Sequence, residues 1–202
     1  PVTIGSYMNE PDIINNKYQL HLAMEEARSV IPKVFREFED MTGRSYAFAE
    51  GYQTSGAEVV LFLLGSSYHT AKEAVDKLRG EGKKVGVFTV NALRPFPSEE
   101  LFKFCKSAKT VVVGDRQDSY GAQGGNMSLE IEAMLQRCGG SARVISRIYG
   151  LGGKDFYVED AEELFQLGLD SDRQKNFDYI GIAKGDPNLD VKQYFEPVAG
   201  GK

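Results

Sequence analysis

Short apolar runs alternate with longer segments in which apolar residues recur every three or four positions, and this alternation constrains the fold most. A continuous apolar run is typical of a strand buried on both faces, and the longer spacing is typical of an amphipathic helix. The expected strands are 58–64, 85–90, 110–113 and 142–146, and Tyr46–Ala49 could form a further short strand. Strands that alternate with helices predict parallel βαβ units with right-handed crossovers. The sequence therefore predicts an α/β fold, a three-layer α/β/α sandwich around a mostly parallel sheet.

The first 45 residues show a different pattern from the rest. Residues 1–16 carry Gly5 and Pro11 and are expected to be an irregular linker from a preceding domain. An apolar stripe at helical spacing then predicts a long helix, with its members at Leu20, Met24, Ala27, Ile31, Val34, Phe38 and Met41. Pro32 interrupts this stripe, so we expect a kink or break near Ile31. Gly43 is expected to end the helix.

The length of 202 residues suits one α/β domain, which we place at 17–170. The segment 171–202 is polar and lacks periodicity, so it is interpreted as an extended C-terminal tail. Such a tail either wraps the domain or docks on a neighbour.

Charge and cysteine content restrict the function classes. The formal net charge is −5 with scattered Lys and Arg, which argues against a nucleic-acid partner. No apolar stretch reaches the roughly 20 residues that span a bilayer, and the start lacks a signal peptide, so we expect a cytoplasmic protein without a membrane partner. Cys105 and Cys138 are interpreted as inert thiols in a reducing compartment. Two thiolates cannot bind a [4Fe–4S] cluster, which normally takes four.

Three turns belong to the edge where parallel strands end, which is where open α/β sheets bind ligands. The first turn is Gly65-Ser66-Ser67, between a strand and a helix. Its free N–H groups could hold an anion. The favoured interpretation is a tight turn with a serine cap, because both the G-x-G-x-x-G spacing and the P-loop lysine are missing.

The second turn contains Arg94 between a strand and Pro95. A guanidinium can bind a carboxylate or phosphate through two parallel hydrogen bonds. A structural salt bridge is the favoured role, and anion binding is the alternative.

The third turn, 115–126, is the most informative stretch. Its glycines allow close backbone approach just before a helix. The favoured interpretation is an interface with a neighbouring subunit, and a small-anion site is the alternative. The candidate residues in this turn are Asp115, Arg116, Gly121, Gly124, Gly125 and Asn126.

The familiar catalytic constellations are missing from the sequence. His21 and His69 do not form a metal pair, and the G-x-S-x-G nucleophile elbow is absent. Acidic pairs near Glu159 suit the first turn of a helix. We therefore expect no catalytic residue, no metal site and no cofactor bound by this chain alone.

Seven motifs in a fixed order resemble a known family. They are Ala57-Glu58-Val59-Val60, Gly65-Ser66, Glu81-Gly82-Lys83-Lys84-Val85-Gly86, Arg94-Pro95-Phe96-Pro97, Asp115-Arg116, Tyr120-Gly121-Ala122-Gln123-Gly124-Gly125 and Tyr149-Gly150-Leu151-Gly152-Gly153-Lys154-Asp155. The series resembles the second, transketolase C-terminal-like domain of the α subunit of pyruvate:ferredoxin oxidoreductase, over residues 1 to about 168.

The resemblance implies a five-stranded, mostly parallel sheet with one antiparallel edge strand, for which the best candidate is near Tyr46–Tyr52. It also implies the reaction of a whole enzyme, which decarboxylates a 2-oxo acid oxidatively to an acyl-CoA and reduces ferredoxin. That enzyme would use thiamine diphosphate, Mg, [4Fe–4S] clusters and coenzyme A, held by other domains or subunits. The long divergent tail leaves the 2-oxo acid open.

Three functions are compatible with these observations. The favoured one is a non-catalytic assembly domain of a 2-oxoacid:ferredoxin oxidoreductase, inactive alone, with the other domains of the enzyme as its partners. The alternative is a stand-alone module that binds a nucleotide or phosphate at the edge of Ser66, Ser67, Arg94 and Gly124–Asn126. An enzyme of another doubly wound family is the third.

Overall fold

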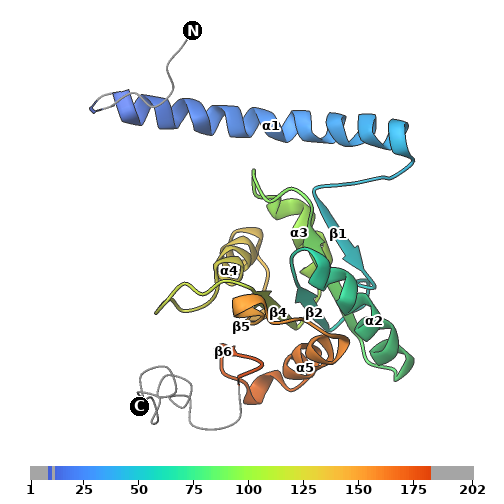
Figure 1. Ribbon diagram of the computed structural model, residues 1–202. Helices are drawn as coiled ribbons and strands as arrows, with labels where there is room; N and C mark the ends of the chain where they lie inside the picture. The colour runs from blue at the N-terminus through green and yellow to red at the C-terminus, as the bar shows by residue number, and fades with distance from the viewer. Residues whose placement is uncertain (1–8, 11, 183–202) are drawn as a thin grey trace, which may run out of the picture.

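The computed structural model describes residues 9–10 and 12–182 (Figure 1). Its elements are, in chain order, α1 (Asp12–Thr42), β1 (Ala49–Tyr52), β2 (Val59–Phe62), α2 (Ser66–Gly80), β3 (Val85–Val90), α3 (Ser98–Cys105), β4 (Thr110–Asp115), α4 (Asn126–Cys138), β5 (Arg143–Ile148), η1 (Leu151–Gly153), α5 (Val158–Leu169), η2 (Ser171–Arg173) and β6 (Phe177–Tyr179).

The described strands form one sheet in the order β1-β3-β2-β4-β5-β6. All neighbouring pairs are parallel except β1 and β3, so the predicted antiparallel edge strand near Tyr46–Tyr52 is confirmed. The sheet has six strands rather than the expected five. The additional strand, β6, has only three residues and pairs with β5 through the backbone, so its side chains give no apolar pattern that reveals it.

The two faces of the sheet are covered by different helices, as Figure 1 shows. Successive side chains of a strand point to opposite faces, so β2 contributes to two separate cores. Leu61 packs in the cluster shared with α2 and α5. Val60 and Phe62 pack in the cluster shared with α3 and α4. Every residue of β2 is buried, which confirms the predicted three-layer α/β/α sandwich.

Helix α1 differs from the expectation in two ways. It begins at Asp12, inside the stretch expected to be irregular, and it continues through Pro32 without a break (Figure 1). Proline lacks the N–H that would bond to the carbonyl of Arg28, and its ring crowds that carbonyl. Because no residue of α1 is fully buried, water can reach this part of the helix and satisfy the freed carbonyl.

The last described residues run along β5, where they include the edge strand β6. Ser146 N donates to Asn176 O at 2.7 Å, and Ile180 N donates to Ile148 O at 3.0 Å, on either side of β6. The start of the segment interpreted as a tail thus lies along β5. Residues 183–202 lie outside the described residues.

Candidate functional site at the carboxyl edge of the sheet

The chain reverses its direction across the sheet between β2 and β4. It proceeds from β2 to β3 on one side and then crosses back to β4 on the other side of β2. The carboxyl ends of two such strands diverge and leave a crevice, which is where ligands bind in open α/β sheets.

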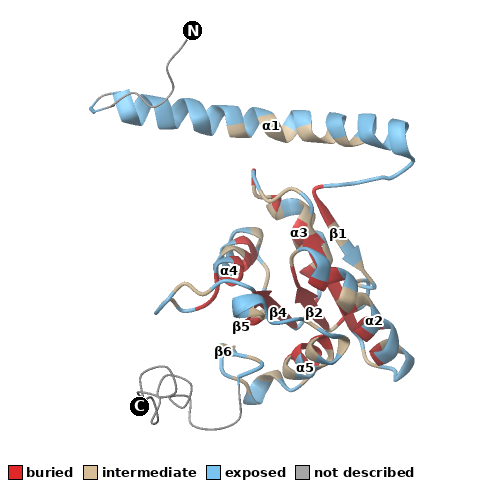
Figure 2. Ribbon diagram, in the orientation of Figure 1, coloured by how far each residue is buried: buried red, intermediate tan, exposed pale blue. Residues whose placement is uncertain are grey.

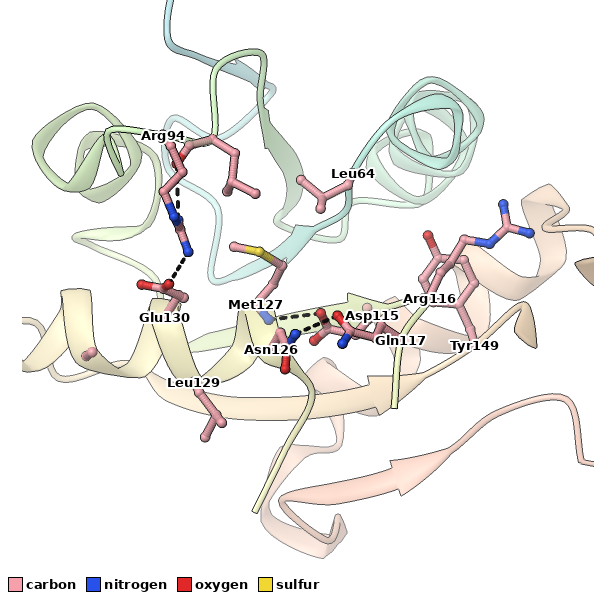
Figure 3. A pocket seen from close by; sticks show the side chains of 13 residues that line it. Leu64, Arg94, Asp115, Arg116, Gln117, Asn126, Met127, Leu129, Glu130 and Tyr149 are labelled. Carbon is pink, nitrogen blue, oxygen red and sulfur yellow. Dashed lines mark hydrogen bonds and ion pairs between the residues drawn. The ribbon is translucent and has the colours of Figure 1, made fainter. Parts of the chain in front are cut away.

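A cavity of about 630 Å³ occupies this crevice (Figure 3). It is lined by Leu64, Leu93, Arg94, Gly114, Asp115, Arg116, Gln117, Asn126, Met127, Leu129, Glu130, Ala133 and Tyr149. Four of the ten residues proposed from the sequence line it, namely Arg94, Asp115, Arg116 and Asn126.

Asp115 anchors the floor of the cavity. Its carboxylate accepts a hydrogen bond from Met127 N at 2.9 Å (Figure 3). It also accepts a longer one from Ser128 N at 3.3 Å, so it caps the start of α4. The side chain comes from the last residue of β4 and is only 4% exposed. Burial raises the pKa of this carboxyl group, and the two amide bonds oppose that rise. A capping carboxylate complements the positive end of the helix, so Asp115 has a structural partner.

Gly124 and Gly125 lie against the same network. A side chain at Gly125 would collide with the carboxylate of Asp115, and one at Gly124 would lie 2.6 Å from Ser128 Oγ. Gly125 N donates to Ser146 Oγ at 3.1 Å, and this hydroxyl lies 2.8 Å from that of Ser128. The two glycines therefore let the loop approach the sheet closely.

The two arginines of the cavity are already engaged. Arg94 forms an ion pair with Glu130 of α4, which agrees with the structural salt bridge favoured from the sequence. Arg116 donates to Gly150 O at 3.2 Å and to Lys154 O at 3.3 Å. The polar groups at this site mainly hold the fold together, and the remaining wall is apolar.

The loop between β4 and α4 borders the cavity through Arg116, Gln117 and Asn126. Asn126 Nδ2 donates to Gln117 Oε1 at 2.5 Å and fixes the base of the loop. Near its tip, Tyr120 is 89% exposed and precedes Gly121, whose φ is +83°. Aromatic residues are enriched in protein–protein interfaces, so this loop is a candidate contact surface.

Gly65, Ser66 and Ser67 belong to a different place. Ser66 and Ser67 are the first helical residues of α2 rather than its cap, and Gly65 occupies the cap position without a side-chain hydrogen bond. Gly65 and Ser66 line a second cavity, together with Thr89 of β3. Of the edge expected from Ser66, Ser67, Arg94 and Gly124–Asn126, Ser66 lines the second cavity and Arg94 and Asn126 line the first. Ser67, Gly124 and Gly125 line neither.

Several polar residues at these sites were not identified from the sequence, and Ser128, Ser146 and Thr89 are examples. Ser128 and Ser146 complete the network around Asp115, and Thr89 lines the second cavity. Each lies in an ordinary helix or strand pattern, so a lone hydroxyl there gives no signal. Only the pairing of strands shows which hydroxyls meet.

The side chains that could bind a metal or cluster are dispersed. Within residues 9–10 and 12–182, no three His, Cys, Asp or Glu side chains group closely enough to hold a metal ion. Cys105 is buried in α3, and burial raises the pKa of its thiol to about 12. The two cysteines of the chain are fewer than the four thiolates that a [4Fe–4S] cluster normally takes.

No helix in the described part of the chain combines the length and apolar character needed to cross a membrane.

The fold and the site define the class of protein. The sheet is doubly wound, with a cavity at its switch point, which makes this chain an open α/β domain. The family model for pyruvate:ferredoxin oxidoreductase core domain II matches residues 57–161. The chain belongs to this family, and it corresponds to the second domain of the α subunit.

Curated relatives extend the similarity beyond the matched domain. The pyruvate synthase subunit PorA of Methanothermobacter thermautotrophicus is 35% identical over 90% of this chain and 46% of its own length. The PorA subunit of Thermotoga maritima is 36% identical over 90% of this chain and 46% of its own. The ketoisovalerate oxidoreductase subunit VorA of Pyrococcus horikoshii is 39% identical over 81% of this chain and 42% of its own length. The chain therefore spans about half the length of the curated relatives that it matches.

Proposed function

We propose that this chain is a non-catalytic assembly domain of a 2-oxoacid:ferredoxin oxidoreductase. Its family and its PorA and VorA relatives support the enzyme class. The engaged polar groups of the switch-point cavity support a structural role, because Asp115, Arg94 and Arg116 already have partners within the fold.

Helix α1 carries the assembly part of this proposal. Its 31 residues include none that is buried, and Figure 2 colours it pale blue except along the side that faces the sheet domain. That side is held by a few contacts, such as the bond from Arg28 to Phe96 O at 2.9 Å and the edge contact of Phe35 with Phe48. Nine other large apolar residues of α1 are at least 38% exposed, namely Ile13, Ile14, Tyr18, Leu20, Leu22, Val30, Val34, Phe38 and Met41.

An apolar surface of this extent favours a partner. Burying one such side chain stabilises a complex by roughly 1.5–3 kcal/mol before the costs of association. The partner that fits is the rest of the same subunit, because the relatives are about twice as long as the stretch that they share with this chain. The exposed Tyr120 loop offers a second contact surface for another subunit.

The reaction would belong to the whole enzyme. We expect it to decarboxylate a 2-oxo acid oxidatively to an acyl-CoA and to reduce ferredoxin, with thiamine diphosphate, Mg, [4Fe–4S] clusters and coenzyme A in other domains. Pyruvate is the substrate class suggested by the names of the PorA relatives, and ketoisovalerate is suggested by VorA. We place the enzyme in the cytoplasm, with ferredoxin as a partner of the whole assembly and without a membrane or nucleic-acid partner.

A turnover assay tests the non-catalytic role. The 202-residue chain is mixed with thiamine diphosphate, Mg, pyruvate, coenzyme A and ferredoxin, and ferredoxin reduction is followed by absorbance. No reduction is expected from the chain alone, and reduction is expected from the complete oxidoreductase under the same conditions. Reduction by the chain alone would disprove the proposal.

A stand-alone nucleotide- or phosphate-binding module is the second candidate function. The cavity at the switch point favours it, because this is where such folds bind ligands. If the chain had this role, α1 would need no partner. Substitutions on the apolar surface of α1 that are assayed for subunit assembly therefore separate the two functions.

A further inference from the structure

Helix α1 carries a second apolar row, apart from the side that is held against the sheet domain. The held side includes Met24, Ile31 and Phe35, which are half-buried, and Phe35 meets Phe48 edge to edge. The second row lies roughly a quarter of a turn away around the helix. We call this row the seam of α1, and its members are Ile13, Asn16, Leu20, Ala23, Ala27, Val30 and Val34.

The spacing of the seam is that of a helix pair. Its members alternate at intervals of three and four residues over three heptads, and six of the seven are apolar. Such a repeat is typical of a helix that packs lengthwise against another helix. Leu20 and Val34 are each 53% exposed, so the seam is open. Ala23 and Ala27 lie in its middle, where small side chains let a second helix axis approach closely.

The outer edge of the seam is polar. Gln19, Glu26 and Lys33 follow one another along it at intervals of seven residues, and all three are exposed. Charged residues beside an apolar seam select the partner and its orientation in helix pairs. Within the described residues, Glu26 and Lys33 form no ion pair. Both charges are therefore available to a partner.

The first part of α1 receives no cover from the sheet domain. Every residue from 12 to 23 is exposed, and Figure 2 colours this end of the helix pale blue. Isolated helices shorter than about 12–15 residues are marginal in water, because most helical stability in proteins comes from tertiary packing. This part of the seam therefore needs a partner that extends past the sheet domain, as a second long helix does.

We propose that one amphipathic helix from the remaining half of the same subunit packs along the seam of α1. The inference rests on the proposed function, because it takes the partner from the part of the subunit that the relatives have beyond the shared stretch. The partner helix has apolar residues at the same spacing of three and four. It places a cation opposite Glu26 and an anion opposite Lys33.

The charge of α1 disfavours a lipid surface as the occupant. The helix has six acidic and four basic residues. Helices that lie on membranes are rich in Lys and Arg on their polar face, because they bind anionic lipids. A protein helix with charges of both signs suits the seam better.

A cysteine scan of the full-length subunit tests the seam. Single cysteines are placed at six exposed positions of α1 in a Cys138→Ser background, three on the seam and three on its far side. The seam variants are Asn16→Cys, Leu20→Cys and Val30→Cys, and the matched controls are Leu22→Cys, Ser29→Cys and Arg36→Cys. Maleimide labelling of the seam is expected to be at least about tenfold slower in the full-length subunit than in the 202-residue chain. The controls should be labelled equally fast in both.

The other outcomes separate the seam from the assembly role of α1. Protection of both rows in the full-length subunit would show that a broad surface covers α1, which overturns the single partner helix and keeps the assembly role. Protection of neither row would overturn both. Protection of the seam in the 202-residue chain that increases with its concentration would assign the seam to a second copy and overturn the proposed partner.

Discussion

At the scale of single residues, Asp115 is the side chain on which the switch-point site most depends. It connects the end of β4 to the first amides of α4, and Gly125 packs directly against it. Replacing it with alanine leaves two amides without their partner, so we expect Asp115→Ala to lower the free energy of unfolding by about 1–3 kcal/mol. Urea denaturation measures this loss. Asp172→Ala, which changes an exposed carboxylate, is the control and should change stability little.

The same carboxyl group makes a pH-dependent contribution. Burial raises its pKa in the folded chain above the ordinary aspartate value. The folded chain therefore binds this proton more tightly than the unfolded chain. The contribution of Asp115 to stability is then complete below the ordinary pKa and decreases as the pH rises through the raised pKa. We expect the stability difference between wild type and Asp115→Asn to shrink from about pH 4 to pH 7. A difference that grows over this range would contradict the raised pKa.

Cys105 offers a residue-scale probe of the core. Its side chain is fully buried, and burial raises the pKa of the thiol to about 12, whereas Cys138 is partly exposed. The thiolate is the reactive form, so Cys105 should resist alkylation in the folded chain. Mass spectrometry after maleimide treatment should find one rapid label, on Cys138, and a second label only in denaturant. Rapid labelling of Cys105 in buffer would show that α3 is packed less tightly than described.

At the scale of elements, α5 packs against the sheet through a glycine. An added Cβ at Gly168 would collide with Val59 of β2 and lie 2.9 Å from Val112 of β4. Overpacking of this kind costs about 1–3 kcal/mol, so Gly168→Ala should destabilise the chain. Gly80→Ala, at the end of α2 where an added Cβ meets nothing within 4 Å, should stabilise it by about 0.4–1 kcal/mol. Denaturation curves that rank the two variants the other way would contradict the described packing of α5.

At the scale of the whole molecule, α1 is the element whose environment is incomplete. Changing Leu20 and Val34 together to lysine should block assembly when placed in the full-length subunit, because lysine disfavours an apolar interface. The same change should leave the unfolding temperature of the 202-residue chain nearly unaltered, since both side chains are about half exposed there. Gel filtration of the oxidoreductase measures assembly.

Glu37→Lys is the matched control, because it changes the charge of an exposed position on the same helix. It should assemble normally. If Leu20→Lys with Val34→Lys also assembled normally, α1 would not be the assembly surface, and the stand-alone module would become the better interpretation.

The sequence by itself determined the class of fold and most of its elements. Strand β2 is a run of apolar residues and α2 has an apolar residue every three or four positions, and such periods depend only on neighbours along the chain. The order of the motifs likewise indicated the family, and the match to core domain II confirms it. Local sequence patterns gave wrong predictions where the structure depends on contacts between residues far apart in the chain, or on contact with water. Strand β6 is defined by pairing with β5, and Pro32 is tolerated because α1 is exposed to water.

Only the tertiary structure decided which of the candidate residues meet. The sequence placed Ser66, Arg94 and Asn126 on one edge of the sheet, because each of them comes soon after the carboxyl end of a strand. The strand order then put Arg94 and Asn126 at the switch-point cavity and Ser66 with Thr89 at another. Strand order depends on backbone pairing between residues that are far apart in the chain. Neighbouring residues do not encode this pairing, and so a motif alone could not reveal either site.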